Sequence, residues 1–169
     1  MTSSNEETVL PPPEPHEAIL AKLQAMGLAL PAAPTPVAAY VPSVRTGNLV
    51  VVSGQLPFRD GQLTSPGRVP SVVPPSEAKD AAGRAALNAV AVLAAALGGD
   101  LGRVRRIVRV GVFVASDDGF SQQPAVANGA SELLAALFGE RGRHARAAVG
   151  VNALPLGASV EVELMAEVA

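Results

Sequence analysis

The sequence of 169 residues contains no cysteine, no tryptophan and only two histidines, His16 and His144. The lack of cysteine excludes disulfides, thiolate metal sites and a cysteine nucleophile. A histidine-rich metal site or a serine–histidine–aspartate triad would need one of the two histidines. His16 lies in a proline-rich segment and His144 in a charged one, so neither favours such a site. We therefore expect no metal and no cofactor.

Aromatic residues are also scarce, at 3% of the chain, and the net charge is −2. Single-stranded nucleic acids are bound by stacking on aromatic rings and by a basic surface. The only basic clusters are RVRR at 103–106 and RGRHAR at 141–146. Both are most simply solvated ends of helices or loops, although the second could hold a small carboxylate. The composition argues against nucleic acid as a partner.

Long apolar runs are missing as well. No run reaches the roughly 20 residues that a membrane span needs. Residues 1–15, MTSSNEETVLPPPEP, are acidic and polar and lack the regions of a signal peptide. We therefore expect a soluble, cytoplasmic protein. Hydrophobic residues nevertheless make up 49% of the chain, which is enough for one domain with a core of valine, leucine and alanine.

The chain divides by composition near residue 37. Residues 1–36 are proline-rich and are predicted to form an extended arm with one short helix. Pro15 suits the first turn of that helix, and Gly27 suits its end. Residues 37–169 are predicted to form the folded domain.

Hydrophobic periodicity within this domain predicts strands and two long helices. Ser76 is the expected N-cap of the first long helix, and a turn at 46–48 should join the first two strands. The expected elements are a strand before that turn, a strand at 49–54, a helix at 76–99, a strand at 104–116, a helix at 123–139, and strands at 145–154 and 159–168.

Alternation along two of the strands indicates which faces are buried. In strand 104–116, Val108 is expected to share a face with Val110, Val112 and Val114. Strand 159–168 alternates apolar residues with glutamates, and these glutamates are expected to share the other face with Arg109. The order of elements predicts an α+β fold in which both long helices cover one face of a mixed sheet. The second, partly apolar face predicts a closed oligomer.

The segment from Arg146 to Glu161 contains no other charged residue. On spacing alone, the two charges are most simply an exposed arginine at the end of a loop and a glutamate on a solvated face. A pair that faces one substrate is the alternative interpretation.

Two stretches resemble the RidA/YjgF family, also called the L-PSP endoribonuclease-like family. They are AAYVPSVRTGNLVVVSGQLP at 38–57 and ARAAVGVNALPLGASVEVELMA at 145–166. The resemblance covers roughly residues 37–168, and the N-terminal extension is similar to that of a longer subfamily. It implies a chorismate-mutase-like α+β fold, assembled as a homotrimer with ligand clefts between subunits.

The same resemblance implies an activity. Well-known members of the family hydrolyse reactive enamine and imine acids, such as 2-aminoacrylate, to 2-oxoacids and ammonia. It implies that Arg146 binds the substrate carboxylate and that Glu161 orients or activates water. It also implies substrate-binding roles for Tyr40, Gly54, Asn128 and the backbone of Ala148.

Two departures from the family pattern affect the shape of the pocket. Ser131 stands where many members carry an aromatic residue, and Ala38-Ala39 replace a Gly-Pro pair before the tyrosine. The first interpretation is a metal-free imine and enamine deaminase. The alternative is a trimer that binds a small carboxylate metabolite without turnover. An endoribonuclease or translation inhibitor is a weaker alternative, because the chain has little basic or aromatic surface.

Overall fold

A five-stranded sheet in the order β1-β2-β7-β5-β6 forms one layer of the molecule. The computed structural model describes residues 10–34 and 39–169. β5 and β6 run parallel, and every other neighbouring pair is antiparallel. The strands are β1 (Ser43–Thr46), β2 (Leu49–Gln55), β5 (Val104–Ala115), β6 (Ala145–Val151) and β7 (Val160–Val168).

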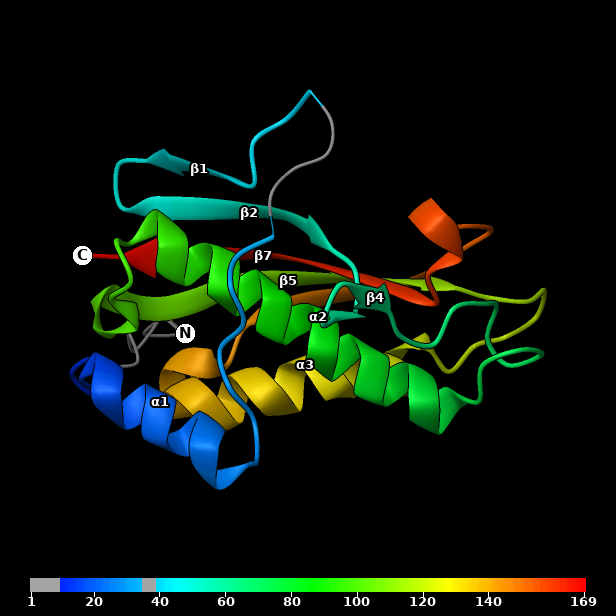
Figure 1. Cartoon of the computed structure of the whole chain (residues 1–169), viewed down its shortest axis with the longest axis horizontal. Helices are drawn as coiled ribbons and strands as arrows, with labels where there is room; N and C mark the ends of the chain where they lie inside the picture. Colours follow the sequence, from blue (N-terminus) through cyan, green and yellow to red (C-terminus); the bar gives the residue numbers. More distant parts are fainter. Residues whose placement is uncertain (1–9, 35–38) are drawn as a thin grey trace, which may run out of the picture.

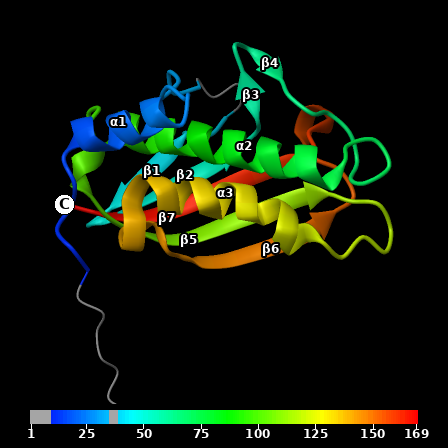
Figure 2. The same ribbon diagram turned by 90° about the horizontal axis from the view of Figure 1, so that it is seen from below.

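Helices α2 (Pro75–Ala96) and α3 (Gln123–Phe138) form the second layer, on one face of this sheet (Figures 1 and 2). The predicted α+β class, the mixed sheet and the placement of both long helices are therefore confirmed. A separate two-stranded sheet of β3 (Phe58–Arg59) and β4 (Gln62–Leu63) lies in the loop before α2. The described residues also contain three short 3-10 helices: η1 (Leu101–Arg103), η2 (Gly139–Gly142) and η3 (Pro155–Gly157).

Small residues let the two long helices approach each other closely. A Cβ atom on Gly129 of α3 would lie 1.9 Å from the backbone oxygen of Lys79 in α2. A Cβ on Gly83 would lie 3.3 Å from the backbone oxygen of Gly129. The alanine-rich face of α2 is buried against the sheet for the same reason, because methyl side chains keep helix and strands near each other. This packing holds α3 firmly above the β6 edge.

The predicted alternation of strand 104–116 is wrong in its first half. The pairing of β5 with β7 shifts register between Ile107 and Arg109, which is a β-bulge. Ile107 is consequently 1% exposed and Val108 38% exposed, so Val108 does not share the buried face of Val110. One extra residue reverses the inward and outward positions on either side of it.

The first long helix also begins one residue before its predicted start. Pro74 occupies the N-cap position of α2 without a side-chain hydrogen bond, and Pro75 is the first helical residue. The prediction of Ser76 as the N-cap is therefore wrong. Proline is favoured at the first helical position because its ring already holds the helical φ angle.

Helix α1 (His16–Ala25) packs against α3 and η1. Ile19 and Leu23 are 0% and 1% exposed and belong to the same hydrophobic core as the sheet. His16 Nδ1 accepts a hydrogen bond from the Leu101 N–H at 3.2 Å. The predicted helix between Pro15 and Gly27 is therefore present and anchored. The rest of the predicted arm falls partly outside the described residues, and the boundary at residue 37 stays a prediction.

Candidate functional site

Arg146 lies on the edge strand β6, opposite Val110 of β5. Val110 is buried under the helices, so Arg146 is on the helix side of the sheet. Its Nη1 donates hydrogen bonds to Asn128 Oδ1 at 2.9 Å and to the Ser131 hydroxyl at 3.0 Å. Its Nη2 donates to the Pro124 carbonyl at 3.3 Å. Helix α3 thus orients an arginine that is still exposed to solvent.

Three bonds leave part of the Arg146 guanidinium free. The group carries five N–H donors, and within residues 10–34 and 39–169 no acceptor meets Nε or the second hydrogen of Nη2. Nε and Nη2 form one edge of the planar group, and such an edge matches the two oxygens of a carboxylate. The arrangement can therefore bind a carboxylate in a bidentate manner.

Two further predicted residues accompany Arg146. Asn128 contacts it directly through the bond already described. Ala148 follows two positions along β6, on the same face, and packs partly buried against the core. Arg146, Asn128 and Ala148 therefore form one group, which we call the arginine side.

Glu161 lies on β7 opposite Phe113 of β5, on the sheet face that the helices leave open. A Cβ atom on Gly54 would lie 1.8 Å from Glu161 Oε1, so the carboxylate rests directly on the bare backbone of β2. Burial, and then the negative charge of Glu163, raise the pKa of the Glu161 carboxyl above its usual value. Among the described residues, no arginine, lysine or histidine forms an ion pair with it.

Tyr40 directly precedes a segment that is bound to Ser53, the residue before Gly54. The segment that follows it is tied to β2, because the Ser53 hydroxyl donates to the Val41 carbonyl at 2.8 Å and the Ser53 N–H donates to Pro42 at 2.9 Å. The Tyr40 side chain is 50% exposed. Tyr40, Gly54 and Glu161 therefore form a second group, which we call the glutamate side.

One chain does not bring the two sides together. Arg146 pairs with Val110 and Glu161 pairs with Phe113, three residues further along β5. Successive strand residues point to opposite faces, and pairing is regular over this stretch, so the two side chains lie on opposite faces of the sheet. β5 also separates β6 from β7. Any site that uses both residues needs a second copy of the chain.

Comparison with known proteins shows the family of this chain. Residues 20–168 match the family described as "YjgF/chorismate_mutase-like, putative endoribonuclease". The chain belongs to this family. The resemblance inferred from the sequence is thereby confirmed.

Individual relatives agree with the family match. The chain is 47% identical over 150 residues to Protein TCP17 of Trypanosoma cruzi, covering 88% of this chain and 93% of that protein. The crystal structure of Atu1372 from Agrobacterium tumefaciens, a protein of unknown function, is 44% identical with a TM-score of 0.87, covering 91% and 94% of the two chains. The YjgF protein of E. coli is 29% identical with a TM-score of 0.54, covering 80% and 92%.

Two residues near Arg146 were not among the predicted site residues. Ser131 drew attention only as a departure from the family pattern, and His144 only as one of two histidines. The structure places the Ser131 hydroxyl between Arg146 and His144, 3.0 Å from Arg146 Nη1 and 3.0 Å from His144 Nε2. Spacing in the sequence carries no signal of this contact, because it depends on how α3 lies over β6.

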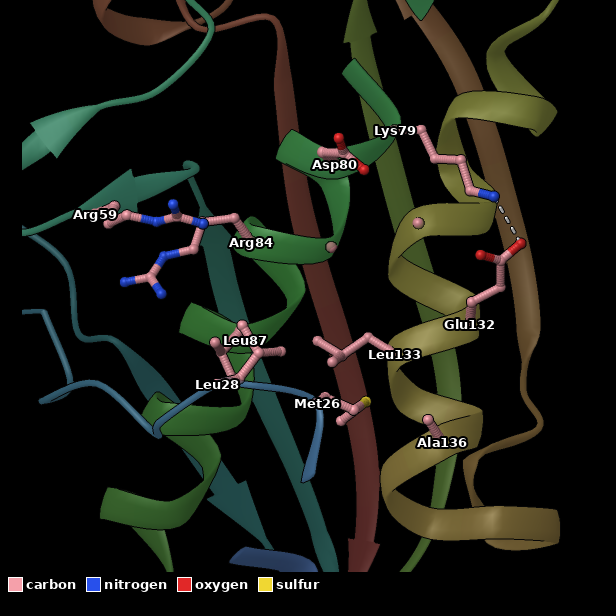
Figure 3. Close-up of a pocket in the computed structure, with 12 residues that line it drawn as sticks. Met26, Leu28, Arg59, Lys79, Asp80, Arg84, Leu87, Glu132, Leu133 and Ala136 are labelled. Atoms are coloured by element: carbon pink, nitrogen blue, oxygen red, sulfur yellow. Dashed lines mark hydrogen bonds and ion pairs between the residues drawn. The ribbon is translucent and has the colours of Figure 1, made fainter. Parts of the chain in front are cut away.

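A separate cavity of about 540 Å³ opens between α2, α3 and the segment after α1 (Figure 3). Apolar side chains such as Leu133 line its middle, Lys79 and Glu132 bridge the two helices at 2.9 Å, and Arg59 and Arg84 lie side by side at one end. None of the predicted site residues lines this cavity. The cavity is therefore separate from both the arginine side and the glutamate side.

The described residues contain no group of three or more histidine, cysteine, aspartate and glutamate side chains that could hold a metal ion. In the same part of the chain, no helix has the length and apolar character needed to cross a membrane.

Proposed function

We propose that this protein hydrolyses small reactive 2-imino acids, including the imine forms of 2-enamine acids, to 2-oxoacids and ammonia. The observation that supports this proposal is the position of the Arg146 guanidinium. Helix α3 holds it by three hydrogen bonds from Nη1 and Nη2, and Nε remains available to a carboxylate. Family membership supports the same activity, because the resemblance to the RidA/YjgF family implies hydrolysis of imine acids. The RidA protein of Psychrobacter is one such relative, at 30% identity and a TM-score of 0.52.

The site is proposed to form between neighbouring copies of a homotrimer. The arginine side of one copy would face the glutamate side of the next, so that Arg146 and Glu161 line the same cleft with the substrate between them. The open face of the sheet supports such an assembly, since it carries exposed apolar residues such as Val44 and Val149. The cleft would then be closed by the backbone at Gly54 and Ala148 and by Tyr40.

Binding of the carboxylate at Arg146 fixes the position of the neighbouring iminium carbon. A water molecule beside Glu161 can attack that carbon while the carboxylate takes one of its protons. Glu161 then returns the proton to the amine nitrogen, the carbon–nitrogen bond breaks, and ammonia leaves with the bonding electrons. The remaining hydroxyl loses its proton to give the 2-oxoacid, and ammonia departs as ammonium.

The raised pKa of Glu161 suits this cycle, because a carboxylate with an elevated pKa is a better proton acceptor than an ordinary one. The absence of an ion pair to Glu161 within the described residues leaves its oxygens available to water. Imines hydrolyse readily in water, so orientation and one proton carrier are sufficient for a useful acceleration.

The direct test generates 2-aminoacrylate enzymatically in situ and follows its loss with and without this protein. Acceleration that disappears in Arg146→Ala supports the proposal. No acceleration at high protein concentration would refute the deaminase activity. Binding of a small 2-oxoacid without turnover would then favour the carboxylate-binding trimer.

A mixing experiment tests whether the site lies between copies. Arg146→Ala and Glu161→Gln chains are co-expressed in equal amounts and purified together, so that homotrimers and mixed trimers are both present in the proportions of random assembly. Clefts that combine the intact side of each variant should make up about a quarter of the total, and activity should return to about that fraction. Activity no higher than that of either variant alone, or a monomer mass by light scattering, would contradict the shared site.

A further inference from the structure

We propose that Ser131 and His144 are positioning residues that hold Arg146 in its carboxylate-binding orientation. The inference rests on the proposed function and deepens it, because it assigns the support of the arginine to two residues that were not among the predicted site residues. The chain of contacts runs from the Gly142 carbonyl through the His144 ring and the Ser131 hydroxyl to Arg146.

The direction of each hydrogen bond follows from its partners. The Gly142 carbonyl can only accept, so His144 Nδ1, at 2.6 Å, carries a proton and donates it. In the neutral ring Nε2 is then an acceptor, and the Ser131 hydroxyl, at 3.0 Å, donates to it. The hydroxyl proton is thereby directed away from Arg146, and the Ser131 oxygen presents lone pairs to Arg146 Nη1.

Protonation of His144 would reverse this arrangement. Nε2 would become a donor to the Ser131 oxygen, which would then receive hydrogen atoms from two cations. Its own proton would need another acceptor, and its bond to Arg146 would weaken. Neutral His144 is therefore the form that supports Arg146.

The surroundings of His144 favour that neutral form. Burial lowers the pKa of His144, and the positive charge of Arg146 on β6 lowers it further, whereas the hydrogen bond that His144 donates to the Gly142 carbonyl opposes this shift. The charged groups on α3 and η2 have other partners. Glu132 of α3 pairs with Lys79 of α2, Glu140 of η2 pairs with Arg143, and Arg141 Nη1 donates to the Val104 carbonyl.

Binding of pyruvate, an unreactive 2-oxoacid, measures the role of Ser131 without requiring turnover. At about pH 8, Ser131→Ala should weaken binding about fivefold, as expected for loss of one hydrogen bond to a charged group. Ser131→Thr keeps the hydroxyl and should bind within about twofold of the wild type. In the deaminase assay, Ser131→Ala should raise KM by the same factor and leave kcat unchanged.

His144→Gln supplies the second arm of the test. A glutamine oxygen can accept the Ser131 hydroxyl but does not titrate. Pyruvate binding to the wild type should weaken as the pH falls through the pKa of His144, and His144→Gln should lack this component. Any pH dependence that Glu161 of the adjoining copy contributes would persist in the glutamine variant, which separates the two groups.

A third measurement needs no ligand. The chain has only two histidines, so nitrogen NMR resolves His144 with His16 as an internal reference. The spectrum should show the neutral ring protonated on Nδ1. The pKa of His144 should rise in both Ser131→Ala and Arg146→Ala, because each change removes a group that favours the neutral ring.

The outcomes distinguish this inference from the proposed function. Pyruvate binding that needs Arg146 but is unchanged in Ser131→Ala would overturn the positioning role and leave the proposed function standing. An Nε2-protonated neutral ring would also overturn it. Pyruvate binding that is unaffected by Arg146→Ala would refute the carboxylate site itself, and the positioning role with it.

Discussion

Glu161 and Glu163 are two residues apart on β7 and lie on the same open face of the sheet, each over a glycine of a neighbouring strand. A Cβ on Gly54 would lie 1.8 Å from Glu161 Oε1, and a Cβ on Gly111 would lie 2.6 Å from Glu163 Oε1. Their partners differ. Arg109 Nη1 donates to Glu163 at 2.9 Å, whereas no ion pair to Glu161 exists within the described residues.

The difference separates a structural carboxylate from a chemically available one. Arg109 forms an ion pair with Glu163 and occupies one of its oxygens. Glu161 is partly buried without a counterion, so the pKa of its carboxyl is raised by burial and by the charge of Glu163. Groups with perturbed pKa values cluster at functional sites, where stability is sacrificed for reactivity. Four experiments test whether the two carboxylates differ in this way.

Removal of each carboxylate should give the largest difference. Glu161→Gln is expected to lower kcat for 2-aminoacrylate about 100- to 1,000-fold, because the proton acceptor is lost. Glu163→Gln should leave kcat within about threefold, since Glu163 is held by Arg109. Steady-state kinetics of both variants measure this, and equal losses would show that the two carboxylates have a common role.

Substitution of the two glycines should act through the same carboxylates. Gly54→Ala displaces Glu161 and should lower kcat about 10- to 100-fold, because general-base catalysis depends on a well-placed group. The chain should still fold, since the new methyl group meets the free end of a side chain. Gly111→Ala is the matched control, because it displaces Glu163 instead, and it should retain most activity. A Gly54→Ala variant with full activity and a normal circular dichroism spectrum would contradict the role of Glu161.

The pH profile should respond to Glu163 through charge alone. Glu161 acts as a base only when ionised, so activity should fall as the pH drops through its raised pKa. Glu163→Gln removes a negative charge that raises that pKa. The acid limb of kcat should therefore move to lower pH in this variant. An acid limb that stays in place would mean that another group controls it.

Thermal stability should show the smallest effect. A carboxyl whose pKa is raised in the folded state stabilises the fold fully only below its unfolded pKa, and this contribution is lost as the pH rises through the folded value. Glu161→Gln should therefore raise Tm by about 1–3 °C near pH 8. The gap to the wild type should close in acid, where Glu161 is protonated. Glu163→Gln should instead lower Tm slightly, because it loses an exposed ion pair.

Much of the fold could be predicted from the sequence because its elements are marked locally. The helix ends at Gly27 and Gly139, the turn at 46–48 and the strict alternation of strand 159–168 all follow from residue type and spacing. The candidate residues came from the family resemblance instead, since Arg146 and Glu161 have no distinctive spacing of their own. Local patterns could not reveal the bulge at Ile107–Arg109, because it depends on the partner strand.

Residue type and spacing were sufficient to predict the class of fold and the buried faces of most elements, and they limit the residues available for chemistry. Side-chain periodicity and turn propensities act over a few residues and need no partner. The tertiary structure sets which charged side chains have an ion-pair or hydrogen-bond partner among the described residues. The register of β5 against β7 lets Arg109 pair with Glu163, whereas Glu161 lies over Gly54. The packing of α3 on β6 places the Ser131 hydroxyl in contact with both Arg146 and His144. These are contacts between distant segments, whose geometry is set only when the whole core is packed.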